Sequence, residues 1–357
     1  MLVALGLILF VLLVVVHEFG HFIVAKRSGV EVEEFGIGFP PRAKLITKRN
    51  GTEYTLNWLP IGGFVKLKGE HDAATEKGSF GAASFSQKVQ IIAAGVIMNW
   101  LSAVVIFTIL AVVGMPQLVE NQFSVKSDRT VTKQQVFVGA VEPNSPAQKI
   151  GLNQGDEIIA INSTKVVSAS DLHSATTANA GKTISLTYSH NSIETIKSVQ
   201  LRDDVKKGNL GVSPGDRMLV RSTWSAPIVG VGTTAQFTAQ TFKGIAVALV
   251  NLFTGHGSEA SASVTGPVGI VVVLKDLASQ GLVFVLFLIG VISVSLAVMN
   301  VLPIPALDGG RLFVMALFKA IKKPLTKETE EKIHGTGMLV LLGLALLITI
   351  VDIRRFF

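Results

Sequence analysis

The chain has no cysteine among its 357 residues, which excludes disulfide bonds and every metal site built on thiolate ligands. Charge is also scarce: Asp, Glu, Lys and Arg make up 16% of the residues, hydrophobic residues make up 49%, and the mean hydropathy is +0.52. So few charges indicate a membrane protein rather than a water-soluble one. The formal net charge is +7, but the basic residues cluster beside hydrophobic runs, so we expect a lipid bilayer as partner and no nucleic acid.

Four apolar runs are candidates for membrane-spanning helices. They cover residues 2–24, 91–114, 282–302 and 337–351. The last run is short and would need its flanks or a thinner bilayer to cross. Residues 2–24 could also form a cleaved signal peptide, but no Lys or Arg precedes Lys26. Residues 233–253 indicate a further amphipathic helix at the membrane surface, and a buried or re-entrant segment fits as well.

The distribution of basic residues predicts the orientation. Ten Lys and Arg lie from Lys26 to Lys88, between the first two spans, and six lie from Arg311 to Lys332, between the last two. The positive-inside rule places both loops in the cytoplasm and both termini outside, although Arg354 and Arg355 argue weakly the other way. Residues 115–226 are also basic, but large translocated domains largely escape the rule.

The first cytoplasmic loop is predicted to hold a small β-sheet. Asn50-Gly51, between residues 43–49 and 52–58, is a strong hairpin signal. Residues 60–63 predict a second turn, and residues 64–68 a third strand. The open edge of such a sheet can pair with an extended peptide, but a sheet that merely caps the helices fits the pattern equally well.

Residues 125–202 indicate a soluble domain. Residues 136–141 predict a strand, and Ser145 opens a short helix before the run Gly-Leu-x-x-Gly-Asp-x-Ile-x-x-Ile-Asn at residues 151–162. This run resembles the signature of a PDZ domain. The resemblance implies a groove that binds a peptide or protein ligand by strand addition. A domain that only fills space or excludes large substrates is an equally open alternative.

The chemistry is concentrated in the first apolar run, at His17-Glu18-Phe19-Gly20-His21. On a helix, residues four apart share a face, so His17 and His21 can bind one cation. Glu18 lies one step around the helix, where its carboxylate can take a proton from an attacking water. Polar residues in an apolar span are costly and functional by default. The alternative is a polar cluster that serves a proton or ion pathway.

A zinc site needs a third protein ligand and an open fourth position. The other histidines and the carboxylates are candidates, and Asp308 stands out because it follows a hydrophobic span in a segment with two prolines and two glycines. Irregular backbone at membrane depth is tolerated where it lines a cavity. From the residues alone, Asp308 is equally compatible with a metal ligand and with the N-cap of the next helix.

The HExxH sequence in a first span, combined with Asn-x-x-Pro-x-x-x-Leu-Asp-Gly at residues 300–309, resembles the site-2 protease family, and the PDZ-like segment narrows the resemblance to its bacterial regulator-of-sigma-E branch. Further resemblance lies at residues 35–40, 60–66, 94–99 and 266–270. It implies that Asp308 is the third zinc ligand. It also implies a set of substrate-binding residues: Asn99, Asn300, Phe64, Val65 and Lys66.

We therefore predict a polytopic α-helical membrane protein of about four transmembrane helices, with a small membrane-associated β-sheet and an inserted PDZ-like α/β domain. The predicted segments are residues 1–114 (two spans and the hairpin loop), 125–202 (the PDZ-like domain), 203–281 (a linker with the amphipathic helix) and 282–357 (two spans).

The predicted function is a zinc-dependent intramembrane endopeptidase with one Zn²⁺, held by His17, His21 and Asp308, and with Glu18 as the base. Its substrates would be single-span membrane proteins, such as anti-sigma factors or remnant signal peptides. Its expected place is the inner or plasma membrane, with the active site toward the cytoplasm and the PDZ-like domain outside. A metal or ion transporter and a catalytically silent PDZ scaffold are the alternatives.

Overall fold

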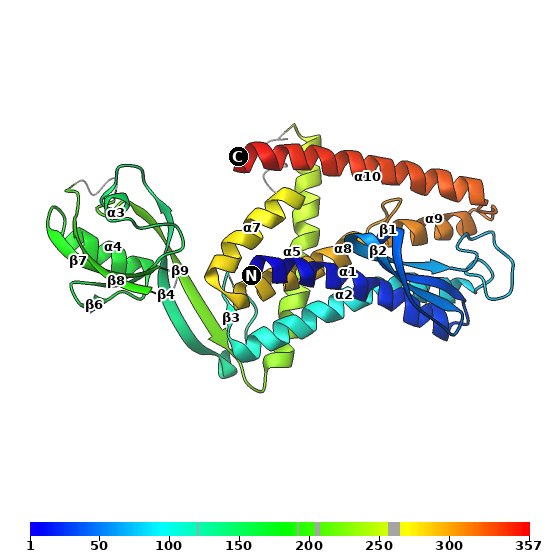
Figure 1. Ribbon diagram of the computed structural model, residues 1–357, viewed down its shortest axis with the longest axis horizontal. Coiled ribbons are helices and arrows are strands. Elements are labelled where there is room, and N and C mark those ends of the chain that lie inside the picture. The colour runs from blue at the N-terminus through cyan, green and yellow to red at the C-terminus, as the bar shows by residue number, and fades with distance from the viewer. Residues whose placement is uncertain (120, 191–192, 204–207, 256–264) are drawn as a thin grey trace. The chain divides into compact units, whose positions relative to one another are not determined.

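The computed structural model describes residues 1–119, 121–190, 193–203, 208–255 and 265–357 (Figure 1). The chain forms two compact units. Unit 1 comprises Met1–Phe107, Gly230–Leu274 and Leu288–Phe357, and unit 2 comprises Thr108–Val229 and Lys275–Phe287.

Within the described ranges, four helices are long and apolar enough to cross a membrane. They are α1 (Leu2–Arg27), α2 (Phe85–Val113), α8 (Leu282–Val301) and α10 (Lys327–Phe356). Their number and order agree with the prediction. The last helix is longer than the predicted residues 337–351, because Thr326 caps it and the polar residues after Thr326 are helical too. Its 30 residues correspond to about 45 Å, but the turns added before Gly337 are polar, so the apolar part of the helix is still the predicted one.

Unit 1 also holds most of three further helices: α5 (Ala226–Phe253), α7 (Pro267–Gln280) and α9 (Asp308–Ala320). α5 includes the predicted segment 233–253. The carboxylate of Asp352, near the end of α10, accepts a hydrogen bond from the backbone N–H of Gly269 at 2.7 Å. This buried contact joins the start of α7 to the last helix.

The loop between α1 and α2 forms a small sheet, called here the ribbon, from two long strands that bend back on themselves, β1 (Val32–Arg49) and β2 (Thr52–Leu67). Asn50 and Gly51 both have positive φ, as the predicted tight hairpin turn requires. The pairing register confirms the predicted second turn and third strand. Residues 34–37 of β1 pair on one side with residues 53–56, in parallel, and on the other side with residues 63–66, in antiparallel orientation. The chain therefore reverses between Leu59 and Gly63, where Gly62 has a φ of 91°, and residues 63–67 form an outer strand of the sheet.

An apolar cluster packs α1, α2 and α9 together around the end of the ribbon. Its buried members include Ala25, Phe80, Ile91, Ile92 and Met315. α1 and α2 approach closely because Gly20 lacks a side chain: a Cβ there would lie 2.6 Å from the carbonyl oxygen of Ala94. The first span is therefore held face to face with the second at the level of the HExxH residues.

Unit 2 contains a seven-stranded sheet in the order β3-β9-β4-β5-β7-β8, with β6 paired to β5. Its strands are β3 (Met115–Pro116), β4 (Thr130–Val141), β5 (Glu157–Ile161), β6 (Thr164–Lys165), β7 (Thr183–His190), β8 (Ile193–Gln200) and β9 (Val212–Arg221). The short helices are α3 (Pro146–Lys149) and α4 (Ala169–Ala178), and Ser168 and Asp171 form a capping box at α4. Because β9 joins this sheet, the sheet extends past the predicted segment 125–202.

Candidate metal centre

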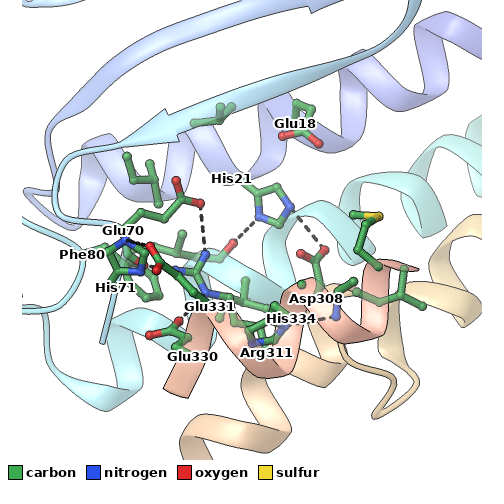
Figure 2. Close-up of a pocket in the computed structure, with 18 residues that line it drawn as sticks. Glu18, His21, Glu70, His71, Phe80, Asp308, Arg311, Glu330, Glu331 and His334 are labelled. Carbon is green, nitrogen blue, oxygen red and sulfur yellow. Dashed lines mark hydrogen bonds and ion pairs between the residues drawn. The ribbon is translucent and has the colours of Figure 1, made fainter. Parts of the chain in front are cut away.

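His17 and His21 lie one turn apart on α1, and their Nε2 atoms are 3.2 Å from each other. Asp308, the first residue of α9, brings its Oδ2 atom to 3.0 Å from His17 Nε2 and 3.3 Å from His21 Nε2. Figure 2 shows Asp308 and His21 facing each other across the cavity between their helices. In the part of the chain that the structure describes, no other group of three His, Asp or Glu converges in this way.

The far sides of both imidazoles are also held. His21 Nδ1 lies 2.8 Å from the carbonyl oxygen of Ile91, so Nδ1–H is the donor and Nε2 keeps its lone pair. His17 Nδ1 lies 3.2 Å from the side-chain amide of Asn99, whose Oδ1 atom is buried without a partner. Turning that amide around lets Oδ1 accept a hydrogen bond from His17 Nδ1–H, which leaves Nε2 of His17 free as well.

These donors fit a zinc ion. Two nitrogens and one carboxylate oxygen present lone pairs to the same point, an arrangement that is repulsive unless a cation or proton lies between them. Zn–N bonds of about 2.0–2.1 Å in a tetrahedral site place ligand atoms roughly 3.3 Å apart, close to the separations found here. A Cβ at Gly95 of α2 would lie 2.5 Å from His21 Nε2 and 2.7 Å from His17 Nε2, so glycine keeps this wall of the site open.

The N-cap alternative for Asp308 is wrong. The N-cap residue of α9 is Leu307, and Asp308 occupies the first helical position with its carboxylate turned to the histidines. The segment before it is irregular, as its prolines require, and Ala306 has a positive φ of 80°. This irregular turn ends α8 and starts α9, and it places the carboxylate opposite α1.

A cavity of about 540 Å³ opens beside this group of side chains. Glu18 and His21 line it from α1, and Asp308 lines it from α9. The apolar part of the lining includes Val65, Leu67, Phe80, Ile91, Ile92 and Met338. A group bound in the cavity would therefore lie close to His21, Asp308 and the Glu18 carboxylate together.

One side of this cavity is charged. Arg311 of α9 donates to Glu70 and forms an ion pair with Glu330 of α10 at 3.5 Å, while its guanidinium lies 4.5 Å above the ring of Phe80. Glu330 also accepts a hydrogen bond from the backbone N–H of Asp72 at 2.8 Å. These contacts connect the start of α10 to α9 and to the loop after β2, as Figure 2 shows.

The predicted substrate-binding residues differ in how close they lie to the cavity. Val65 lines the cavity beside Glu18, whereas the ring of Phe64 packs over Gly36 and Lys66 is exposed and paired with Glu33 at 2.8 Å. Asn99 is buried behind His17. Asn300 is half-buried in the last turn of α8.

Two residues close to the candidate metal centre, Gly95 and His334, were not singled out by the sequence analysis. Gly95 was recognisable only as part of a family resemblance. No pattern in the neighbouring sequence indicates that its Cα lies against the rings of His17 and His21, where a side chain would not fit. His334 was only one of several histidines that could have been the third ligand. It lines the cavity instead: its Nδ1 accepts a hydrogen bond from the backbone N–H of Ala306 at 3.1 Å, and its buried Nε2 has no partner among the described residues.

Comparisons with known proteins show what the whole chain is similar to. A family model described as peptidase family M50 matches residues 5–344. A Clostridium perfringens protein named as a candidate zinc metalloprotease is 35% identical over 99% of this chain and 98% of its own length. Zinc metalloprotease RasP of Geobacillus kaustophilus is 26% identical over 98% of this chain and 97% of that protein. A solved PDZ domain of an SdrC-like protein from Listeria monocytogenes is 25% identical, with a TM-score of 0.22, and covers 24% of this chain and 92% of that one.

Proposed function

The chain belongs to peptidase family M50 and is a zinc metalloprotease, and from that premise we propose that it cleaves peptide bonds inside the membrane, in the transmembrane segments of other proteins. The observation that carries the proposal is the convergence of His17 Nε2, His21 Nε2 and Asp308 Oδ2 beside the Glu18 carboxylate, on helices apolar enough to span a bilayer.

The proposed roles follow from where each side chain lies. His17, His21 and Asp308 hold Zn²⁺, which when bound supplies Lewis acidity to the reaction. Glu18 accepts the proton of the attacking water and passes it to the leaving amide nitrogen. Asn99 and the Ile91 carbonyl orient the two imidazoles. His334, held through Nδ1, carries its proton on Nε2 and donates it in a hydrogen bond to a carbonyl of the bound substrate.

A transmembrane substrate must unwind before it can be cut, because its peptide groups are hydrogen-bonded within a helix. β2 can take over those groups. It pairs only with β1 in the described structure, and the segment from Phe64 to Lys66 includes a residue that lines the cavity. The substrate strand therefore adds to the free edge of β2, and Asn300 binds a further backbone group.

The proposed setting is a bacterial plasma membrane crossed several times, with the cavity toward the cytoplasm and the PDZ-like domain outside. The basic loops on either side of the catalytic residues support this orientation. The substrates are single-span proteins, with anti-sigma factors and remnant signal peptides as the expected classes from the family resemblance. The PDZ-like domain binds a peptide or protein ligand that has already been exposed outside.

The test is to compare the membrane peptides of cells that carry the wild-type chain or Glu18→Gln. We expect uncut transmembrane segments to accumulate in the variant, because loss of a general base lowers turnover by about 10²–10⁴-fold. The matched control is Glu194→Gln, an exposed residue of β8. Purified Glu18→Gln should keep about one zinc per chain. Zinc or ion transport by the purified protein, with no cleavage of any membrane peptide, would refute the proposal.

A further inference from the structure

Two strands of unit 2 continue beyond its apolar core as an exposed ribbon. Val136 and Val138 of β4 are buried in that core, whereas the first five residues of β4 are exposed. This outer part pairs with the end of β9, from Gln134↔Met218 to Thr130↔Arg221 (Figure 1). We call residues 126–134 and 217–224 the stalk.

Two candidate membrane spans meet the stalk. At one end, the backbone N–H of Ser222 donates to the carbonyl oxygen of Ala111, in the last turn of α2, at 2.7 Å. At the other end, the guanidinium of Arg217 lies between the rings of Phe137 and Phe284, at 4.9 and 4.8 Å, and Phe284 is in the first turn of α8. With α2 and α8 inserted as the proposed function requires, the stalk is placed at the depth of lipid headgroups, which fill about 5–8 Å on each side of the hydrocarbon core.

The stalk has a strong excess of positive charge. It contains Lys126, Arg129, Lys133, Arg217 and Arg221, and its one carboxylate is Asp128. All of these cations except Arg217 are exposed. Among residues with a described structure, no carboxylate lies within ion-pair distance of the four exposed cations. The carboxylate of Asp128 instead accepts hydrogen bonds from Thr223 and Ser225, just before α5.

The stalk also carries apolar groups that suit a membrane surface. Trp224, next to the start of α5, is 65% exposed, and Val131, between Arg129 and Lys133, is 46% exposed. Tryptophan is enriched at the membrane–water interface because its ring is apolar and its N–H is polar. At this depth, the exposed cations can bind lipid phosphate groups. The exposed indole can insert at the boundary between the headgroups and the acyl chains.

We propose that the stalk binds the phosphate headgroups of anionic phospholipids in the leaflet next to the PDZ-like domain. The proposal rests on the membrane insertion of the proposed function, but it is independent of the catalytic centre. It also accounts for a cluster of basic residues on the side that the positive-inside rule leaves poor in them. Lipid binding would fix the PDZ-like domain close to the bilayer, where a membrane-anchored ligand is within its reach.

The absence of cysteine makes a direct test possible. An environment-sensitive dye on Ser127→Cys reports the stalk, and a dye on Val105→Cys, on an exposed face of α2, reports insertion of the span. The full chain is reconstituted in nanodiscs of phosphatidylcholine or of an equal mixture with phosphatidylglycerol. We expect the anionic lipid to lower quenching of the Ser127 dye by aqueous acrylamide at least about threefold, and high salt to reverse the change.

The decisive comparison is between two triple variants with the same loss of charge. Lys126→Gln, Lys133→Gln and Arg221→Gln together should abolish the response to anionic lipid. Lys149→Gln, Lys165→Gln and Lys182→Gln, at exposed sites away from the stalk in unit 2, should leave it unchanged. Equal quenching of the wild-type stalk dye in both nanodiscs overturns the proposal, and so does shielding that appears only when an acidic peptide is added, which would assign the stalk to a protein partner. A Val105 dye that is quenched in both nanodiscs would instead show that the chain is not inserted, and the proposed function would fail with it.

Discussion

In the described part of the chain, histidine and aspartate side chains meet at two places, and only one of these places is suited to bind a metal. In unit 2, His190 Nδ1 lies 2.6 Å from Asp156 Oδ1, while the other carboxylate oxygen of Asp156 accepts a hydrogen bond from the backbone N–H of Asn153 at 2.9 Å. Both oxygens of Asp156 are therefore occupied. In unit 1, Asp308 Oδ2 faces two Nε2 atoms and has no hydrogen-bond partner.

The difference shows what makes a metal centre. The Asp156 pair closes on itself, and a third ligand is missing. At the other contact, three donor atoms converge, both imidazoles are oriented from behind, and Gly95 leaves room on the open side. Proximity of histidine and aspartate is thus insufficient, and convergence of several lone pairs on a vacant point is the distinguishing property.

The largest expected effect is a difference in zinc content between variants of Asp308 and Asp156. Asp308→Ala removes the third ligand, so we expect the purified chain to lose its zinc and all detectable cleavage. Asp156→Ala should leave about one zinc per chain, because it touches none of the ligands. Metal content measured by mass spectrometry, with cleavage of a transmembrane peptide as the second readout, checks both. Equal zinc in the two variants would show that Asp308 is not a ligand.

The second-largest expected effect is a loss of zinc affinity when a side chain is added at Gly95, which lies against both histidines. In Gly95→Ala the new methyl group would occupy space within 2.7 Å of both Nε2 atoms, so we expect zinc affinity to fall by about 100-fold. Gly343→Ala is the control, since a Cβ at that helical position meets no atom within 4 Å. Competition with a zinc chelator measures both affinities. A Gly95→Ala chain that binds zinc as tightly as the wild type would mean that the ion lies elsewhere.

A smaller effect is expected from Asn99, which contacts His17 without lining the cavity. Asn99→Ala should lower zinc affinity by about 10–100-fold, the usual result of removing the group that orients a ligand histidine. Ser102→Ala, one turn further along α2, removes a hydroxyl that bonds only to the carbonyl of Met98 and should leave the affinity unchanged. If Asn99→Ala changes the Michaelis constant alone, Asn99 contacts the substrate as originally predicted.

The smallest expected effect is a loss of stability on breaking the contact between His190 and Asp156. His190→Ala should destabilise the PDZ-like domain by about 1 kcal/mol, since one partner of a half-exposed hydrogen bond to a carboxylate is lost. Hydrogen exchange in β5 and β7 of the full chain should then be faster by roughly fivefold, with zinc content unchanged. Loss of zinc in this variant would contradict the conclusion that the His190–Asp156 contact takes no part in metal binding.

The sequence predicted those parts of the protein whose information is local. The apolar runs gave the four long helices, Asn50-Gly51 gave the hairpin, and the spacing of His17 and His21 placed both on one face of α1. Asp308 could be ranked above other carboxylates only through its irregular setting and a family resemblance, because even the nearer of its two partners, His21, lies 287 residues earlier (308 − 21).

Residues 60–63 have the composition of a turn and reverse the chain as predicted, because residues 53–56 and 63–66 pair with opposite sides of the same segment of β1. The features that the sequence did not predict depend on tertiary packing. The position of Gly95 against the histidines and the unpartnered Nε2 of His334 depend on how helices pack, and no pattern within one helix contains that information.

The distance along the chain between the ligands also sets an order of events during synthesis. α1, with both histidines and Glu18, is made first, and Asp308 follows only after the ribbon, two further spans and the PDZ-like domain. With the proposed ligand set, a nascent chain that stops before residue 308 holds only two of the three zinc-binding side chains. Completion of the proposed catalytic site therefore coincides with completion of the fold.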